Sequence, residues 1–393
     1  MRKALLLLHR YVGLGIAAFL ALSGITGSVI AFNHEIDEGL NPGFYAASTE
    51  GPALPLRDLV ARVETVYPDI FIDGASLPDH AGAPVSLWAE PREGKDETIN
   101  QIFVDPATGE ILGARNFGAC CFSAENLIPF LYVFHYSLSL PERWGVWLMG
   151  LIAIFWFFDC FVGAVLTFPK GRPFFANWRP AFGLKRGAGS YRRNLDLHRA
   201  GGLWSWLLLA MLALSGIAMN LQYEVFRPLL SLVTPLSPSP LEIGMPRFTE
   251  KVSPPALGFD EAMARGVEVA AAQGEPGRAL GAYHFGQFRA WLIVVGEEEH
   301  GPGLGAARIY LDDATGDPLL TELPGRGTAG DIFLQLQFPL HSGQIIGLPG
   351  RILIAVMGLV VATLSVTGII LWGYKRKGRV TLRRRRREVA ATS

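Results

Sequence analysis

The amino-acid sequence predicts an α-helical membrane protein with four transmembrane helices in two parallel repeats, each carrying an extracytoplasmic α/β domain. Three observations support this fold class: an apolar composition, four long apolar stretches, and a set of motifs that occurs twice. Hydrophobic residues make up 50% of the 393 residues, and the mean hydropathy is +0.28. This composition is more apolar than that of an ordinary soluble domain.

Four apolar stretches reach the length of about 20 residues that a helix needs to cross a bilayer. They are Tyr11–Phe32, Gly145–Phe168, Gly202–Leu221 and Leu348–Trp372. The first stretch follows Arg2 and Lys3, as the apolar part of a signal peptide does. It is longer than such a part and is not closed by a small-x-small cleavage site. We therefore expect it to remain in the protein as a membrane helix.

The motifs around the first and third stretches repeat. The first copy consists of Leu8–Arg10, Gly13–Leu14 and Ala21–Ile25, and the second consists of Leu197–Arg199, Gly202–Leu203 and Ala213–Ile217. A turn-like Asp-x-Ala-Thr-Gly run begins at Asp105 and again at Asp312, and His135 and His341 each precede an apolar stretch. The repeated unit is therefore an apolar helix, a polar domain and a second apolar helix, used twice.

The distribution of charge predicts the orientation. The formal net charge is zero, but basic residues concentrate in segments 1–10, 170–199 and 375–393. The positive-inside rule places these segments and both termini in the cytoplasm, and residues 33–144 and 222–347 on the periplasmic side of a bacterial inner membrane. A basic tail beside a membrane helix is expected to contact anionic lipid headgroups and not nucleic acid.

The two outer segments read as small α/β domains. Each has one amphipathic helix, at Pro55–Tyr67 and at Phe259–Ala271. Alternating apolar residues predict strands at Val85–Ala89, Ile99–Val104, Trp291–Val295 and Arg308–Leu311. The Asp-x-Ala-Thr-Gly runs lie between strands and carry the residues of tight turns, so we interpret them as structural hairpin turns.

These patterns divide the chain into consecutive segments. They are transmembrane helix 1 at 1–33, a first outer domain at 34–128, an interfacial helix with transmembrane helix 2 at 129–169, a basic cytoplasmic loop at 170–200, transmembrane helix 3 at 201–222, a second outer domain at 223–330, an interfacial helix with transmembrane helix 4 at 331–374, and a basic cytoplasmic tail at 375–393.

The order of the motifs resembles a known family. The run DPATGE at 105–110, on a small helix-and-strand domain, resembles a PepSY domain. Its insertion between the LHRxxGL and LHSGxxxGLPGR helices is similar to the PepSY-associated transmembrane proteins, which include iron-regulated inner-membrane proteins and ferric-siderophore reductases. The resemblance implies a haem-bearing membrane reductase or, for members without shown activity, a membrane-anchored PepSY protein.

Four histidines form the candidate site. Parallel repeats put equivalent residues at equal depth, so His9 is expected to face His198 at the cytoplasmic side and His135 to face His341 at the outer side. Two neutral imidazoles are the axial ligands that a six-coordinate b-type haem needs. The chain has no Cys-x-x-Cys-His motif, so two b haems held without covalent bonds are expected. The alternative is that histidines at helix ends extend to water or lipid phosphate.

Small residues line the helices that carry His9 and His198. They are Gly13, Ala17, Gly24 and Gly27 on the first helix, and Gly202, Ala213 and Gly216 on the third. At about 100° per residue, Gly27 and Gly216 share a face with the histidines of their helices. These stripes provide room for a porphyrin or, alternatively, for close packing between helices.

Two polar residues near the membrane have open roles. His34 lies 25 residues after His9, which returns it to nearly the same helix face, so it is either a reserve ligand of the outer haem or an interfacial polar residue. Asp159 is an acid inside a predicted span, where a charge is costly. It serves either a proton or quinol reaction or a local hydrogen bond.

The remaining candidates are cysteines and outer histidines. Cys120 and Cys121 are adjacent, so they form a vicinal disulfide, two free thiols or a redox-sensitive pair. Cys160 is expected to be a small apolar residue of the membrane. His80, His284 and His300 show no metal-ligand spacing and are interpreted as surface or structural residues.

The sequence thus favours an inner-membrane reductase that carries electrons outward through two haems to a periplasmic acceptor, which the family resemblance suggests is a ferric siderophore. No flavin or nicotinamide motif is recognised, so the electron donor is expected to be a quinol or a separate cytoplasmic reductase. The alternative is a haem-free membrane-anchored PepSY protein that binds or regulates a periplasmic partner. A transporter is less favoured, because the four helices lack broken segments and buried charge pairs.

Overall fold

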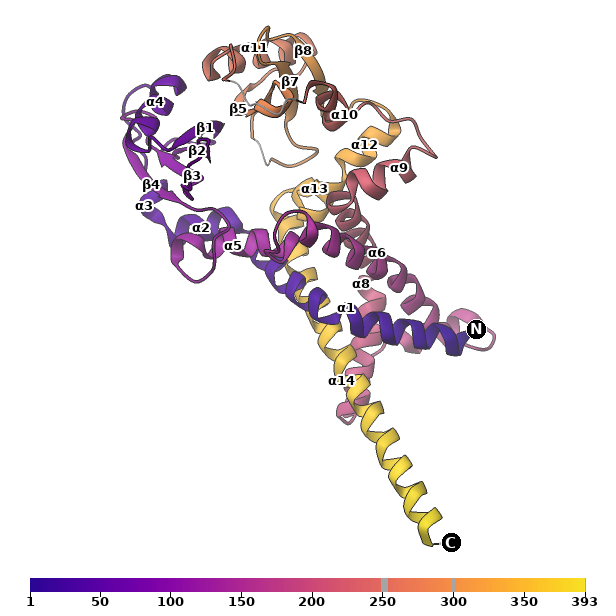
Figure 1. Ribbon diagram of the computed structural model, residues 1–393. Helices are drawn as coiled ribbons and strands as arrows, with labels where there is room; N and C mark the ends of the chain where they lie inside the picture. Colours follow the sequence, from indigo (N-terminus) through magenta and orange to yellow (C-terminus); the bar gives the residue numbers. More distant parts are fainter. Residues whose placement is uncertain (249–253, 299–300, 393) are drawn as a thin grey trace.

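The computed structural model describes residues 1–248, 254–298 and 301–392, and Figure 1 shows a helical stem below a sheet-containing part. Among the described residues, four helices are long and apolar enough to cross a membrane. They are α1 (Arg2–Ile30), α6 (Trp144–Thr167), α8 (Ser190–Asn220) and the part Leu348–Leu382 of α14 (Leu348–Thr392). The four predicted membrane helices are confirmed.

Three of these helices extend well beyond the predicted stretches. Helix α1 begins at Arg2 instead of Tyr11, α8 begins at Ser190 instead of Gly202, and α14 continues to Thr392 instead of ending near Trp372. The added residues are rich in Lys, Arg and Leu, which have high helix propensity. The backbone hydrogen bonds of the helix therefore continue beyond the part that would lie in a bilayer. The predicted basic tail is therefore a continuation of the last membrane helix.

The four long helices form a closed ring. Helix α1 packs along α14 and α6, and α8 packs along the same two helices, so α1 and α8 stand at opposite corners. Buried apolar side chains fill part of the interior, including Cys160, Leu209, Leu212, Met357 and Val361. Large apolar side chains on the outside remain exposed, including Leu22, Phe158, Leu207 and Leu359. Such a surface is unfavourable in water and suits a lipid environment.

Helices α1 and α14 approach each other closely where they cross at Gly24 and Gly358. A methyl group built on Gly24 would overlap the carbonyl oxygen of Gly358, and the converse also holds. The Ser28 hydroxyl donates across the same interface to the carbonyl of Ala355, at 2.7 Å. At Gly24, therefore, the small residue serves helix packing and not cofactor room.

The strands form one eight-stranded antiparallel sheet with the order β4-β3-β2-β1-β5-β6-β7-β8. The strands are β1 (Ile70–Ser76), β2 (Val85–Pro91), β3 (Gln101–Val104), β4 (Ile111–Arg115), β5 (Arg278–Phe285), β6 (Ala290–Gly296), β7 (Ala307–Asp312) and β8 (Pro318–Glu322). The junction between the two groups of four is short, because β1 and β5 pair only from Gly74 with Tyr283 to Ser76 with Gly281.

One face of the sheet is covered by α4 (Leu56–Val66) and α11 (Phe259–Ala272), which form a single core with it. Leu59 and Val63 of α4 pack with alternate residues of the strands, as the period of two in a strand requires. Asp260 of α11 accepts hydrogen bonds from the first amides of α4, from Leu56 at 3.0 Å and from Arg57 at 3.1 Å. The carboxylate therefore caps α4 and ties the two groups of strands together.

Both Asp-x-Ala-Thr-Gly runs are hairpin turns, as predicted. The Asp105 carboxylate accepts from the amides of Ala107 (2.7 Å) and Thr108 (3.0 Å), and Gly109 has a φ of +72°. The second turn repeats these bonds at Asp312, with Ala314 at 2.8 Å and Thr315 at 2.9 Å. The aspartates are engaged by the turn backbone, which accounts for their place in the motif.

A buried ion pair connects the sheet to the helices. Arg115 at the end of β4 donates two hydrogen bonds to Asp37 of α2 (Asn33–Leu40), at 2.9 and 2.8 Å. Both side chains are at most 5% exposed. Arg115 also donates to the carbonyl of Glu125 at the start of α5 (Ala124–Ser137), and Tyr45 donates to Asp37. This network fixes α2 and α5 beneath the sheet.

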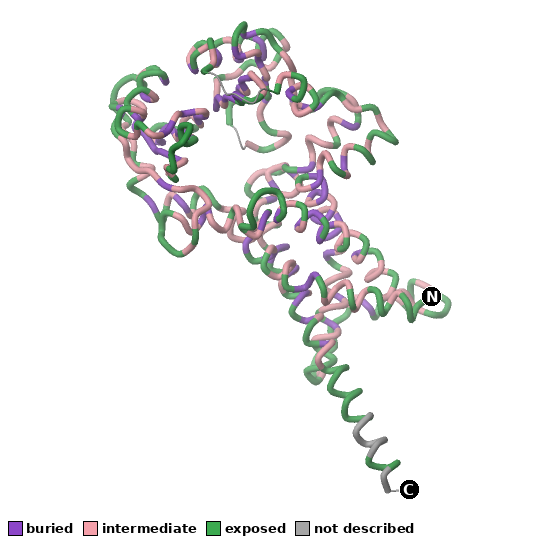
Figure 2. The backbone as a smooth tube through the Cα atoms, in the orientation of Figure 1, coloured by how far each residue is buried: buried purple, intermediate pink, exposed green. Residues whose placement is uncertain are grey.

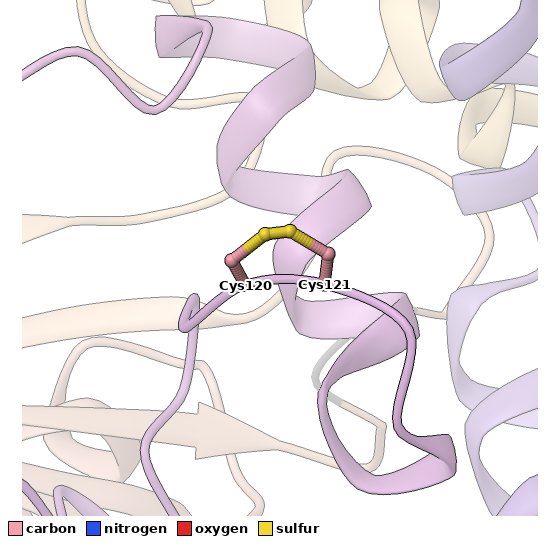
Figure 3. The surroundings of a disulfide bond; sticks show 2 residues. All are labelled: Cys120 and Cys121. Carbon is pink, nitrogen blue, oxygen red and sulfur yellow. A yellow bond between two sulfur atoms is a disulfide. The ribbon is translucent and has the colours of Figure 1, made fainter.

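The remaining helices are short. They are α3 (Pro42–Tyr45), α7 (Phe174–Trp178), α9 (Arg227–Leu230), α10 (Pro240–Gly244), α12 (Ala329–Gln335) and α13 (Gln337–Ser342). Figure 2 shows that buried residues concentrate in the sheet and in the middle of the helical stem, whereas Tyr374 to Leu382 of α14 are exposed. Between β4 and α5, Cys120 and Cys121 are joined as a vicinal disulfide, so of the alternatives for this pair the structure has the disulfide (Figure 3).

Candidate functional site

The first histidine pair, called site 1, consists of His9 on α1 and His198 on α8. The centroids of the two imidazole rings lie 6.0 Å apart and the ring planes are inclined by 52°. Because α1 and α8 occupy opposite corners of the helical ring, the two side chains meet inside it. The structure therefore brings together the histidines of the two repeated Leu-His-Arg motifs.

Each ring of site 1 is held through its Nδ1 atom by a neighbouring helix. Nδ1 of His9 lies 2.9 Å from both carboxylate oxygens of Asp159 on α6. Nδ1 of His198 lies 3.0 Å from the carbonyl oxygen of Leu364 on α14. A carboxylate and a carbonyl only accept, so both histidines donate from Nδ1, and in the neutral form each keeps its lone pair on Nε2.

The second pair, called site 2, consists of His135 in the last turn of α5 and His341 on α13. The ring centroids lie 6.2 Å apart, and the planes are inclined by 68°. Helix α5 leans on α1 and α13 leans on α8, so the same two membrane helices support both sites.

The rings of site 2 are held by hydroxyl groups of the membrane helices. Nδ1 of His135 lies 3.0 Å from the hydroxyl of Thr26, which donates its proton to the carbonyl of Leu22 in its own helix. Nδ1 of His341 lies 2.8 Å from the hydroxyl of Ser215, which donates to the carbonyl of Met211. Since each hydroxyl proton is engaged, each oxygen accepts from the histidine, and Nε2 again keeps its lone pair.

The geometry of both pairs fits the axial ligands of a haem. A metal-bound histidine characteristically donates its other ring nitrogen to a carboxylate, carbonyl or similar acceptor, and all four rings do so. Two metal–nitrogen bonds of about 2 Å, plus half the width of each ring, put the centroids of two axial imidazoles roughly 6 Å apart. The observed separations of 6.0 and 6.2 Å match that value.

Glycines give the histidine rings their space. A Cβ atom built on Gly163 would lie 3.5 Å from Cε1 of His9, and one on Gly368 would lie 3.2 Å from Cε1 of His198. A Cβ on Gly27 would lie 2.9 Å from Cε1 of His135. Gly216, in contrast, faces the side chain of Ala153 on α6. The predicted small residues thus divide between ring contact, as at Gly27, and helix packing, as at Gly24 and Gly216.

The geometry can be compared with known families. A family model described as the PepSY-associated TM region matches residues 6–375, nearly the whole chain. The chain belongs to this family. No match was found among curated proteins. Both histidine pairs of this PepSY-associated TM protein lie within the matched region, and the family together with the four apolar helices makes it a membrane protein.

The sites of the PepSY-associated TM protein are far apart along the helices. Thr26 follows His9 by the same number of residues as Ser215 follows His198, namely 17. At about 1.5 Å of rise per residue, this spacing separates the two sites by roughly 25 Å along α1 and α8. Such a separation is close to the thickness of about 30 Å of a bilayer's hydrocarbon core.

The other histidines lie elsewhere. His34 is exposed on α2 and meets Tyr45 edge to face at 5.6 Å, so the structure places it beside that tyrosine and not in either pair. His80 is exposed and contacts Asp79 at 2.6 Å, and His284 is buried against Asp313 at 3.1 Å. His300 lies outside the described residues. Within the described part of the chain, no group of three or more His, Cys, Asp or Glu side chains suits a metal ion.

Several partners of the histidines were not predicted. The repeated motifs include Ser215 within Ala213–Ile217 but indicate no role for it, and they do not mark Thr26 or Thr367, whose hydroxyl lies 3.2 Å from Nδ1 of His198. The common spacing of 17 residues from His9 to Thr26 and from His198 to Ser215 is the signal that marks the first two. For Asp159, the structure shows the hydrogen bond to His9, one of the two roles left open.

Proposed function

We propose that the protein is an inner-membrane reductase that holds two b-type haems, one at each histidine pair, and moves electrons across the membrane to a periplasmic acceptor. The observation that carries the proposal is the common arrangement of the four histidines. All four have Nδ1 against an oxygen acceptor, so that the neutral ring presents the Nε2 lone pair, and they form two pairs with separations suited to axial ligation.

In this proposal His9 and His198 would hold the inner haem, and His135 and His341 would hold the outer one. A haem bound at either site would supply one-electron chemistry. The protein's own residues fix the ring orientations through Asp159, Leu364, Thr26 and Ser215. Because the residues beside the rings are glycines, no larger side chain at these positions pushes the histidine rings away.

The orientation follows from the basic segments. Lys and Arg residues flank the ends of α1, α6, α8 and α14 that lie near site 1, which supports a cytoplasmic position for this end and for both termini. In the proposed orientation, site 2 and the sheet lie in the periplasm. Anionic lipid headgroups are the expected partners of the basic tail.

The electron donor in this proposal is a quinol or a cytoplasmic reductase, which reaches site 1 from the cytoplasmic side. The acceptor reaches site 2 beneath the sheet. The acceptor proposed here for this PepSY-associated protein is a ferric siderophore. One-electron reduction of Fe(III) to Fe(II) weakens a siderophore's hold on the iron, and a haem at site 2 would supply electron-transfer chemistry there.

The test is the reduced-minus-oxidised optical spectrum of the detergent-purified protein, with the ratio of haem to protein. We expect two b haems in the wild type, one in His198→Ala and one in His341→Ala. His34→Ala is the matched control, because His34 is exposed and lies beside Tyr45, and this variant is expected to keep both haems.

Absence of haem bands after expression with an adequate haem supply would refute the proposal. The protein would then be better described as a haem-free membrane-anchored PepSY protein that binds or regulates a periplasmic partner. Loss of one haem in His34→Ala, with both retained in His341→Ala, would instead move the outer ligand to His34.

A further inference from the structure

The four histidines have partners of different charge. His198, His135 and His341 donate to neutral oxygens of a carbonyl or a hydroxyl group. His9 alone among the four donates to a carboxylate, that of Asp159. The carboxylate lies within the membrane helix α6 and its side chain is only 10% exposed.

The sequence repeat shows that this charge is not needed to hold the ring. Asp159 stands four residues before Gly163, which contacts His9, and Leu364 stands four residues before Gly368, which contacts His198. The two positions therefore correspond. At one, a side-chain carboxylate accepts the histidine proton, and at the other a backbone carbonyl accepts it at nearly the same distance.

A carboxylate in this place has a cost. Charged groups inside a membrane helix are unfavourable, and they mark functional positions by default. Since a backbone carbonyl fixes His198 without that cost, orientation of the ring does not explain why an acid stands beside His9. The negative charge of the Asp159 carboxylate therefore needs another explanation.

A negative charge next to a ligand affects the redox equilibrium of the group that the ligand holds. It favours the more positive, oxidised form, and the strong hydrogen bond makes His9 a more basic ligand, which acts in the same direction. The hydroxyl groups of Thr26 and Ser215 at site 2 carry no such charge. Lys375 also lies at the site 1 end, but it is exposed, where water and salt screen its charge.

We propose that Asp159 acts through His9 and gives site 1 a lower reduction potential than site 2. This inference rests on the proposed function, since it requires haem at both sites. With the lower potential at the cytoplasmic side and the higher at the periplasmic side, the protein itself favours electron movement outward. The asymmetry between Asp159 and Leu364 would then set the direction of an otherwise duplicated structure.

The experiment is an anaerobic redox titration followed by optical spectroscopy, on wild type, Asp159→Asn and Thr367→Val. Asparagine keeps an acceptor oxygen for His9 and removes the charge. We expect two separate midpoints in the wild type and a selective rise of the lower midpoint in Asp159→Asn, so that the two steps approach each other. The low-spin electron paramagnetic resonance signal of one haem is expected to change with it.

Thr367→Val is the matched control, because it removes a neutral partner of the other site 1 ligand while the Leu364 carbonyl remains. Its midpoints are expected to shift less than those of Asp159→Asn. The haem assignment comes from His198→Ala, in which the remaining midpoint belongs to site 2. An Asp159→Asn protein that holds two haems with unchanged midpoints would overturn the inference.

The design separates the two proposals. A wild type without haem refutes the proposed function, whereas two haems with midpoints insensitive to Asp159 refute only the inference. If Asp159→Asn does not retain the site 1 haem, Asp159→Glu replaces it in the titration. A low midpoint preserved by glutamate supports the role of the charge, and a midpoint raised to that of site 2 contradicts it.

Discussion

The hydroxyl of Thr26 accepts a hydrogen bond from Nδ1 of His135 at 3.0 Å while donating its own proton to the carbonyl of Leu22. A single hydroxyl thus connects the membrane helix α1 to the histidine of α5. The hydroxyl fixes both the orientation and the tautomer of the His135 ring, so its removal should affect site 2 and not site 1.

The first prediction concerns Thr26→Val, which keeps the shape of the side chain and removes the hydroxyl. Loss of such a partner of a ligating histidine typically weakens metal affinity by about 10–100-fold. Under the proposed function, we expect faster transfer of one of the two proposed haems to an excess of a haem-scavenging protein. Ser28→Ala, on the same helix, removes a hydroxyl that faces α14 and should leave haem transfer unchanged. Equal effects of the two variants would contradict the role of Thr26.

The second prediction concerns the glycine beside His198. A Cβ on Gly368 would lie 3.2 Å from the imidazole, so the larger side chain in Gly368→Leu must displace the ring. We expect this variant to retain one haem, with the spectrum of site 2. Gly15→Leu is the control, because Gly15 is exposed on α1 and has no atom within 4 Å of its Cβ position. Two haems in Gly368→Leu would show that the ring has more freedom than the structure indicates.

The third prediction concerns the buried pair of Arg115 and Asp37. Removing one partner leaves the other charge buried without compensation, which costs about 3–5 kcal/mol. Arg115→Met should therefore strongly lower the midpoint of thermal unfolding in detergent. Arg92→Met, which breaks a partly exposed pair with Glu64, should cost only about 0–1 kcal/mol. Similar losses in both variants would mean that the buried network does not secure the sheet.

The fourth prediction is a pH dependence that originates in the sheet. Asp73 is the extra residue of the bulge in β1, and burial, together with the nearby carboxylate of Glu90, raises its pKa to about 7. The folded protein therefore binds a proton that the unfolded chain releases near pH 4, so the stability from this group falls as the pH rises from about 4 to about 7. Asp73→Asn removes that loss.

We expect Asp73→Asn to raise the unfolding temperature at about pH 8.5 and to change it little at about pH 4. The measurement is thermal unfolding of wild type and variant at both pH values in the same detergent. Glu90→Gln should give a smaller change of the same sign, because it removes only the second cause. A variant that is less stable than the wild type at the higher pH would show that Asp73 is ionised and satisfied in the fold.

The membrane helices and the turns were predictable because their signals are local. Apolar length alone predicts α1, α6, α8 and α14, and the Asp105 and Asp312 turns follow from the residues that tight turns require. The strands β1, β4, β5 and β8 were not predicted. Their alternation is interrupted by bulges and glycines, as at Gly74 and Gly281, so the period of two is lost.

Contacts between residues far apart in the sequence were harder to predict. The duplication indicated which histidines would face each other, but the hydrogen-bond partners of their Nδ1 atoms come from other helices, and a carbonyl such as that of Leu364 has no sequence signature. The buried pair of Asp37 and Arg115 joins residues 78 positions apart, and neither lies in a recognisable motif. Ligation of haem itself stays a prediction that the spectra described above will decide.

The short junction of β1 with β5 has a mechanical consequence. Its central residues, Ala75 and Ala282, are fully buried, and the backbone bonds around them link the strands that follow α1 to the strands that follow α8. A rocking movement of one pair of membrane helices against the other, as in transport by alternating access, would have to pull this junction apart. The shared sheet is therefore expected to resist movement of one pair of membrane helices against the other, and with it any change in the distances between the paired imidazoles.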